Sequence, residues 1–462
     1  MKPALFPIAL AALAISVPVH AQPPTDATLT LERAIEIALE RQPTLAAARA
    51  NRQASEARLN QARTAYLPRV TPTYQIQALT NTGTINQILP GGIVVPVTQT
   101  KSTTTRQEDL STTLRVLDSG NRDVSIRQAK WNLRGSTFAE ENARQTTIGN
   151  VADAYYGALR NDALVKVSEA QVERAKNTLD LIQAQITAGL AAEKDNLQPQ
   201  ADYLNAQVSL LQARNNADIA RTQLRNAMGI TDPLAFALPQ VPAPDPSAPM
   251  AAVVDGITPA SPSDTAIPKL VAHAIAERPD LAQGRANIEV GGAAVRLSKI
   301  SAGPQITLDA TARYQFDAKN DPFTSIGNNK ILSMSLTGPL FDGGNARMGI
   351  RAAEAQQRAT IAQVDNQRQG VILEVEQAWR NLQQARFTLP ATSAAQLAAQ
   401  TAYEKAVESK REGTGSIVEI ITAQTQLVQA QTNYVQAIFN FHTADARLAR
   451  ALGQADRIVS KR

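Results

Sequence analysis

Strict alternation of apolar and polar side chains marks two stretches of the chain. The longer one has apolar side chains at every second position: Ile306, Leu308, Ala310, Ala312, Tyr314 and Phe316. The shorter one does the same at Val70, Pro72, Tyr74 and Ile76. Successive side chains of a strand point to opposite faces, so this period of two predicts strands at about 304–317 and 69–78.

A second alternating stretch follows each of these strands, at about 109–117 and 330–341. The connection between the partners is rich in Gly and Asn in both cases, and in the first it runs from about Ala78 to Glu108. We interpret each pair as a β-hairpin with a loop at its outer tip. A hairpin packed on the core of a soluble protein would alternate in the same way.

Long stretches rich in Ala, Gln, Arg and Glu, and poor in Pro, predict helices at about 121–188 and 345–411. At 1.5 Å per residue, each would form a rod about 100 Å long. Pro390 is the exception in the second stretch, and we expect a kink or a break there.

The last helical stretch indicates how these rods pack. Two apolar series recur every seven residues: Ile420, Leu427, Tyr434, Phe441 and Leu448, and Ala423, Ala430, Ala437, Ala444 and Ala451. Such heptads define a coiled-coil seam, and alanine in the seam lets two helix backbones come close. These side chains are therefore expected to pack rather than to act chemically.

Short turns separate each rod from the helix that follows it. Gly189 and Gly413 are suited to end the rods in a left-handed conformation. Asp195 and Ser416 are suited to cap the next helices. Each half of the chain therefore predicts one long helical hairpin.

The sequence contains an internal duplication, so the same order of predicted elements occurs twice. Pro43 recurs as Pro279, and the motif that begins at Asp118 recurs at Asp342. The first repeat is predicted at 29–229, with its helical hairpin at about 121–229. The second repeat is predicted at 267–455, with its helical hairpin at about 345–453. A signal peptide at 1–21 precedes the repeats, a Pro-rich linker at 230–266 joins them, and a tail at 456–462 follows.

The first residues predict export. Lys2 precedes an apolar stretch from Leu5 to Val17, and Ala21 ends a typical cleavage motif. A retained anchor is the alternative, but the stretch is shorter than the roughly 20 residues that span a bilayer as a helix.

The composition argues against catalysis and against metal or cofactor binding. There is no Cys, and the histidines His273 and His442 are isolated in the sequence, so we expect no metal, no cofactor and no enzymatic activity. His273 lies in an apolar helical stretch and is expected to pack. The net charge is +5, but the Lys and Arg residues are scattered among Asp and Glu without forming a run. This pattern indicates a solvated surface rather than nucleic-acid binding.

Export together with two-faced strands points to the outer membrane. Strands can lie in lipid only when their edges are closed into a barrel. Four strands are too few, because even small membrane barrels need about eight. The sequence therefore predicts a barrel that several chains share.

The duplicated unit of helix, two strands and long helical hairpin resembles the outer-membrane efflux protein family typified by TolC. Residues 335–344 are similar to the family's strand-end motif, and residues 34–45 to its opening helix. The resemblance covers roughly residues 29–229 and 267–455. It implies a mainly α chain with a small β part, which forms a homotrimer in the outer membrane of a Gram-negative bacterium and extends into the periplasm.

The resemblance also implies a function. Three chains would share a twelve-strand barrel and a twelve-helix tunnel, an exit duct for small molecules or polypeptides. A periplasmic adaptor and an inner-membrane pump would dock at the inner end, at the tips with Gly189, Leu190 and Gly413. The cargo is not indicated.

In relatives, acidic residues and an Arg hold the entrance shut. The matching acidic positions are Asp195 and Glu419, whereas Gly415 replaces the Arg and Thr422 replaces a second Asp. The resemblance therefore implies an ionic lock that is weaker or built differently. An ordinary exposed carboxylate is the alternative for Glu419.

A periplasmic coiled-coil adaptor is the alternative for the whole chain. Adaptors present one helical hairpin inside a small β-domain, whereas this chain has two complete repeats.

Overall fold

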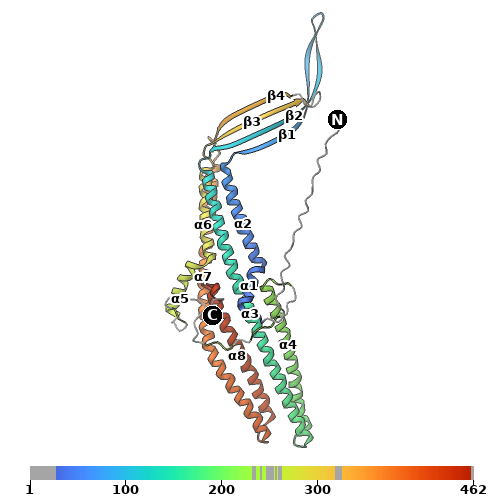
Figure 1. Cartoon of the computed structure of the whole chain (residues 1–462), viewed down its shortest axis with the longest axis vertical. Helices are drawn as coiled ribbons and strands as arrows, with labels where there is room; N and C mark the ends of the chain where they lie inside the picture. Colours follow the sequence, from blue (N-terminus) through green and yellow to red (C-terminus); the bar gives the residue numbers. More distant parts are fainter. Residues whose placement is uncertain are drawn as a thin grey trace.

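The computed structural model describes residues 28–231, 236–239, 242–245, 254, 257–258, 263–317 and 325–458. The predicted signal peptide and most of the predicted linker lie outside these residues. The chain is long and narrow, with a sheet at one end, a layer of helices in the middle and two helical hairpins at the other end (Figure 1).

The first repeat contains the elements α1 (Leu31–Arg41), α2 (Pro43–Arg63), η1 (Thr64–Tyr66), β1 (Arg69–Leu89), β2 (Ile93–Leu117), α3 (Asn121–Thr187), η2 (Glu193–Asn196) and α4 (Leu197–Ala227). The second contains α5 (Ser263–Glu277), α6 (Pro279–Ile300), β3 (Gln305–Asp317), β4 (Ser325–Thr337), α7 (Asn345–Arg411), α8 (Ile417–Ala451) and η3 (Ala455–Ile458). Most of the chain is helical, as the sequence predicts.

The four strands form one antiparallel sheet in the order β1-β2-β3-β4. The sequence-based bounds of β1 and β2 were wrong, because both strands continue through the expected loop and pair as far as Leu89 and Ile93. Residues 79–104 are rich in β-branched Thr, Val and Ile, which favour strands. Gly91 and Gly92, both with positive φ, allow the tight turn between them.

The bounds of β4 also differ from the prediction of 330–341. The strand begins at Ser325 and ends at Thr337. Pro339 follows directly after Gly338, and proline has no N–H to donate to a ladder, so the pairing stops there. The connection between β3 and β4 lies outside the described residues.

The predicted rods are present as α3 and α7, each 67 residues long. Of the kink or break expected at Pro390, the break is wrong, because α7 is continuous through this residue. Leu382, Ala385 and Leu389, which lie within about two turns before the proline, are buried. This packing holds the helix where one backbone hydrogen bond is missing.

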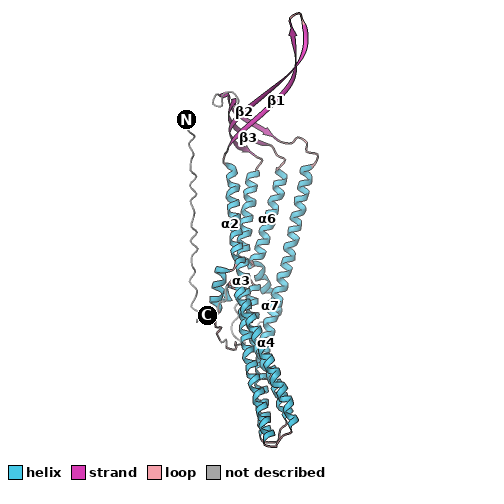
Figure 2. Ribbon diagram, turned by 90° about the vertical axis from the view of Figure 1, so that its right-hand side faces the viewer, coloured by secondary structure: helices cyan, strands magenta, loops and turns pink. Residues whose placement is uncertain are grey.

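Helices α2, α3, α6 and α7 lie side by side below the sheet (Figure 2). Farther down, α3 pairs with α4 and α7 pairs with α8. The coiled-coil prediction for α8 is confirmed by the burial of Ile420, Leu427, Phe441 and Leu448. No helix in the described part of the chain is long and apolar enough to cross a membrane.

The main core lies halfway along the molecule, where the shorter helices meet the rods. Tyr155 and Trp379, which the duplication pairs, are both buried there. The Tyr155 hydroxyl donates to the carbonyl of Leu29 at 3.0 Å, and the Trp379 indole N–H donates to Ser263 Oγ at 3.3 Å. His273 also packs in this region, against Gln454, with 2.7 Å between their side-chain nitrogens.

The two repeats hold the end of the last helix of each helical hairpin in the same way. In the first repeat, the Gln42 side chain donates to the carbonyl of Ala227 at the end of α4 (3.1 Å). In the second, Arg278 Nη1 donates to the carbonyl of Ala451 at the end of α8 (3.0 Å). Both side chains satisfy carbonyl groups that a helix end leaves without partners.

Candidate functional site

Both helical-hairpin tips lie at the end of the molecule opposite the sheet (Figure 1). In the first tip, Gly189 has φ +73° and follows the end of α3. The N–H of Leu190 donates to the carbonyl of Gln185 at 2.8 Å, which closes the helix end. The Leu190 side chain is 79% exposed at the extremity of the molecule.

The second tip is closed by similar contacts. Gly413 has φ +81°, and its N–H donates to the carbonyl of Lys410 at 3.2 Å. The Ser416 hydroxyl accepts from the N–H of Val418 at 3.3 Å and caps α8, as the sequence predicts. The two tips therefore have defined turns that present their outer residues to solvent.

Gly415 lies against the end of α7. Its φ is not positive, but a Cβ at this position would lie 2.9 Å from the backbone nitrogen of Lys410 and 3.0 Å from Ser409 Cβ. Any side chain here would force the turn to open. The packing therefore gives a physical reason for glycine at this position.

The expected cap by Asp195 was wrong. Asp195 lies within η2, and its Oδ2 accepts from the N–H of Ala192 at 3.2 Å. The chain makes this extra turn before α4 begins at Leu197, so the carboxylate stabilises the tip turn instead of the helix. It is partly exposed.

Glu419 and Thr422 lie on successive turns at the start of α8. Glu419 is exposed and, among the described residues, forms no ion pair. Its place in the first helical turn is favourable for a carboxylate, because the N-terminus of a helix carries partial positive charge. The Thr422 hydroxyl donates to the carbonyl of Val418 at 2.7 Å.

The site residues inferred from the sequence are thus divided between two tips. Gly189, Leu190 and Asp195 belong to the first, and Gly413, Gly415, Glu419 and Thr422 to the second. The helices of the single chain form an open layer (Figure 2), so the described residues of one chain do not enclose a passage.

The sheet at the other end has two different faces. On one, the register places Leu308 beside Leu114 and Met334, and Ala310 beside Leu332. Leu332 is 73% and Met334 74% exposed, so this apolar face is uncovered in the single chain. The sheet also has two unpaired edges, β1 and β4.

The opposite face of the sheet is polar and internally bonded. Arg313 Nε lies 2.9 Å from Asp109 Oδ1, in an ion pair between β3 and β2. The Thr113 hydroxyl donates to Asp309 Oδ1 at 2.7 Å. The alternation in the sequence therefore marks one apolar and one polar face, as predicted.

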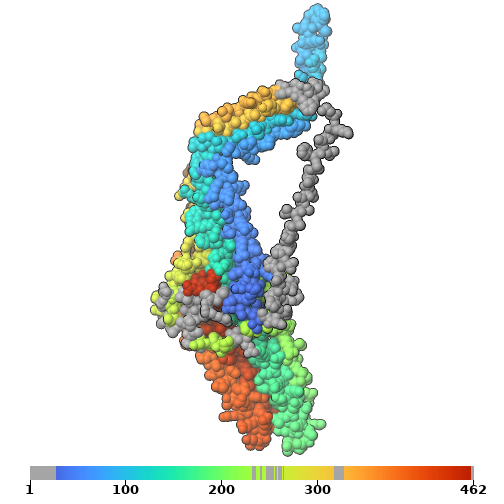
Figure 3. Space-filling model, in the orientation of Figure 1, coloured from blue at the N-terminus to red at the C-terminus, as the bar shows by residue number. Residues whose placement is uncertain are grey.

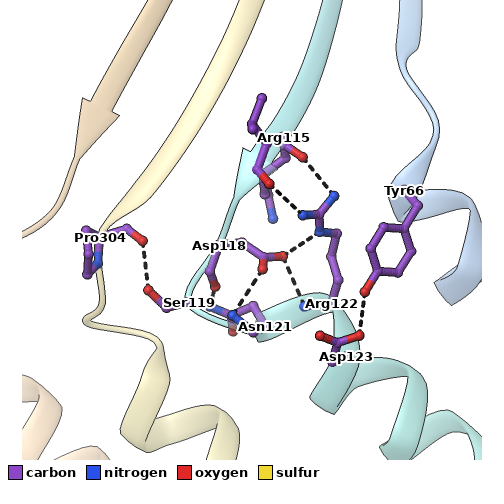
Figure 4. A network of polar contacts seen from close by, with 10 residues as sticks. Tyr66, Arg115, Asp118, Ser119, Asn121, Arg122, Asp123 and Pro304 are labelled. Atoms are coloured by element: carbon purple, nitrogen blue, oxygen red, sulfur yellow. Dashed lines mark hydrogen bonds and ion pairs between the residues drawn. The ribbon is translucent and has the colours of Figure 1, made fainter.

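A polar network that the sequence reasoning missed joins the sheet to α3 (Figure 4). Asp118 is buried, and its Oδ2 accepts from the N–H of Arg122 at 3.0 Å and from its Nε at 2.8 Å. The guanidinium also donates to the carbonyls of Arg115 and Val116, at 2.7 and 3.2 Å. It lies 4.4 Å from the centroid of the Tyr66 ring, which connects α2 to this corner.

The second repeat keeps only part of this network. Asp342 accepts from the N–H groups of Ala346 at 2.7 Å and Gly344 at 2.9 Å, and these bonds hold the pKa of Asp342 below its usual value. Ala346 stands where the first repeat has Arg122. Leu340 and Phe341 beside it are almost fully exposed. Comparison of residues 118–122 with the equivalent residues 342–346 was the signal that could have revealed the network.

A duplicated chain with an open two-faced sheet at one end and long helical hairpins at the other has the architecture of outer-membrane channels. The solved structure of the Campylobacter jejuni CmeC outer membrane channel has this fold, with a TM-score of 0.75 at 15% identity over 98% of this chain and 94% of that one.

The chain belongs to the outer membrane efflux protein family, whose sequence profile matches residues 34–230 and 270–454. It is 26% identical to Protein CyaE of Bordetella pertussis over 344 residues, which are 74% of this chain and 69% of that protein. It is 23% identical to outer membrane protein TolC of Escherichia coli over 349 residues, 72% of this chain and 66% of that protein, just under two thirds. Membership of this family places the chain in the outer membrane of a Gram-negative bacterium.

Proposed function

We propose that three copies of this chain form the exit duct of a tripartite efflux or type I secretion system. The observation that carries the proposal is the four-stranded sheet, which has an uncovered apolar face and two unpaired edges. In lipid, unpaired backbone groups cost several kcal/mol each, so both edges require partners. Pairing β1 of each copy with β4 of the next closes a barrel of twelve strands.

The same trimer explains why the two flanks of the helical layer expose apolar side chains. An apolar stripe on α4 is exposed in the single chain and consists of Leu197, Leu204, Val208, Leu211 and Ile219. On the opposite flank, α7 exposes Phe387 and Leu397. In a ring of three copies, α4 of one copy faces α7 of the next, so both surfaces become buried. The resulting twelve helices would enclose a tunnel through the periplasm.

The tips are the proposed inner entrance of this tunnel. Leu190 and the turns at Gly189 and Gly413 form the outermost surface, where a periplasmic adaptor and an inner-membrane pump would dock. Exported small molecules or polypeptides would then pass through the tunnel passively.

Glu419 is the proposed charge of the constriction. Three copies of an exposed carboxylate around a narrow axis would attract cations into the opening. Gly415 and Thr422 carry no charge to pair with it, so the entrance would be closed by packing of the tips more than by an ionic lock. Asp195 contributes through the shape of its turn.

Single-channel recording tests the constriction. Glu419→Gln is expected to reduce cation selectivity, and Glu412→Gln, at the exposed end of α7, serves as the matched control. Unchanged selectivity in Glu419→Gln would remove this residue from the narrowest part of the duct.

Cell fractionation tests the duct itself. The mature protein is expected in outer membranes as a trimer that dissociates on heating. An adaptor, the alternative reading, would instead be recovered from the periplasm or the inner membrane, and its sheet would have no reason to expose an apolar face.

A further inference from the structure

The first β-hairpin extends well beyond the rest of the sheet. The last pair between β2 and β3 is Thr105 with Asp317, whereas β1 and β2 continue to pair as far as Leu89 and Ile93. We call residues 78–104 the outer ribbon. It stands clear of the rest of the molecule at the end opposite the helical tips (Figure 3).

The outer ribbon changes character along its length. Its lower half is rich in hydroxyl groups, and the Thr82 and Thr100 hydroxyls lie 3.2 Å apart across the two strands. Its tip is apolar on both faces: Ile85, Ile88, Leu89, Ile93 and Val94 are all large and exposed. Lys101 is the one charged residue in residues 78–104.

An isolated two-stranded ribbon with open edges and an apolar tip requires a covering partner. Two strands alone are marginally stable in water, and exposed apolar edges attract other strands. The partner must therefore be one that is always within reach.

Lipid does not fit this role. The 13-residue strands β3 and β4 already exceed the 9–11 residues that cross a bilayer, so the ribbon projects beyond the hydrocarbon. A band of Thr and Ser also separates its tip from the sheet. A lipid anchor would have the opposite order, with its apolar residues next to the sheet.

Other copies of the ribbon do fit. Twelve tilted strands about 4.8 Å apart form a barrel with a radius of about 12 Å. The ribbon has about 12 residues per strand, which corresponds to about 40 Å. Three ribbons that start on the rim can therefore reach the axis. Their tips carry no charge, so three identical tips meet without electrostatic repulsion.

We propose that the apolar tips of the three outer ribbons pack against one another over the outer mouth of the duct and form a cap that exported molecules must displace. This inference rests on the proposed trimer. The cap would oppose inward passage of large molecules while the duct is idle.

Cysteine cross-linking in intact cells tests the cap, because the chain has no cysteine of its own. Ile88→Cys lies in the tip. The matched control Ser102→Cys lies near the base of the ribbon, where copies would be about 20 Å apart, too far for the roughly 4 Å Cβ separation of a disulfide. Cysteines at position 88 would face one another within one trimer and so have a high effective concentration. Ile88→Cys should therefore form at least about ten-fold more cross-linked dimer than Ser102→Cys.

A deletion variant provides a second measurement. Joining Gln77 to Thr105 through an Asn-Gly turn removes the ribbon and leaves the four-stranded sheet intact. The variant should keep its heat-labile trimer and show a higher single-channel conductance than the full chain.

Three results would contradict the cap, and a fourth would contradict the duct. An Ile88→Cys trimer without cross-links would overturn the cap while the duct stands, as would equal cross-linking of both cysteines. An unchanged conductance in the deletion variant would likewise overturn the cap. Absence of the trimer in the unmodified protein would instead overturn the proposed duct.

Discussion

At the scale of single residues, a few polar side chains hold the corners where strands become helices and where helices end. Asp118 satisfies backbone N–H groups at the start of α3, Arg122 satisfies carbonyls at the end of β2, and Arg278 satisfies a carbonyl at the end of α8. The contact of Arg278 was not predictable from the sequence, because it depends on which helix ends meet in space, whereas the repeated motif at Asp118 and Asp342 was a signal for the first network. The glycines of the tips were predictable, since Gly189 and Gly413 must adopt positive φ.

Arg122→Met should destabilise the junction between sheet and helices. The substitution leaves the Asp118 carboxylate buried without its cation, a change that typically costs about 3–5 kcal/mol. The midpoint of thermal unfolding in detergent is therefore expected to fall clearly. Arg127→Met, on an exposed position of the same helix, is the control and should leave the midpoint almost unchanged.

The ion pair between Arg278 and Asp280 predicts a pH dependence. Burial disfavours the Asp280 carboxylate, but the hydrogen bonds and charge of Arg278 outweigh this and hold the pKa of Asp280 below its ordinary value of 3.8. A lowered folded-state pKa stabilises the fold above the ordinary value, and the contribution is lost as the pH falls through the lowered one.

The measurement is the difference in unfolding midpoint between the unmodified protein and Asp280→Asn. The difference should be constant from neutral pH to about pH 5 and shrink below about pH 4. A difference that stays the same through acid pH would show that the ionised carboxylate does not contribute.

At the scale of elements, the spacing of apolar and polar residues along the sequence was enough to predict most of the helices and strands. The extents of α3 and α7 followed from long stretches rich in Ala, Gln, Arg and Glu, in which Pro390 is the one proline, and the faces of the sheet followed from the alternation. The long ends of β1 and β2 were missed because Thr- and Asn-rich segments occur in loops as well as strands. Their pairing depends on the turn at Gly91 and Gly92, not on alternation.

The turn at the second tip gives a testable contrast between two glycines. Gly415→Ala places a Cβ 2.9 Å from the Lys410 nitrogen, and overpacking of this kind typically costs about 1–3 kcal/mol. Faster proteolysis at this tip is the expected result. Gly370→Ala, where a Cβ meets nothing within 4 Å in the middle of α7, should be neutral or stabilising.

At the scale of the whole molecule, the single chain leaves several apolar surfaces uncovered. Its sheet exposes an apolar face, the flanks of its helical layer expose apolar side chains, and Leu340 and Phe341 project from the corner of β4 and α7. Each of these surfaces lies on the lipid side or at a boundary with another copy in the proposed trimer. The strands alone do not specify the number of copies, because two chains would already supply the eight strands of a small barrel. Three copies are what the resemblance to the outer membrane efflux protein family implies.

The lipid-facing side of the sheet can be tested by charge. Met334→Lys is expected to lower the amount of assembled protein in the outer membrane, because a cation on the lipid face costs about 2–4 kcal/mol near the bilayer midplane. Ser333→Lys, on the polar face of the same strand, is the matched control and should assemble. Equal assembly of the two variants would argue against lipid contact.

The mass of the purified particle in detergent, measured by native mass spectrometry, directly tests whether three chains assemble. Three chains per particle, with none recovered as a folded single chain, is the expected result. A particle of one chain that stays folded in water without detergent would contradict it, because such a chain would have to cover the apolar face of its sheet by itself.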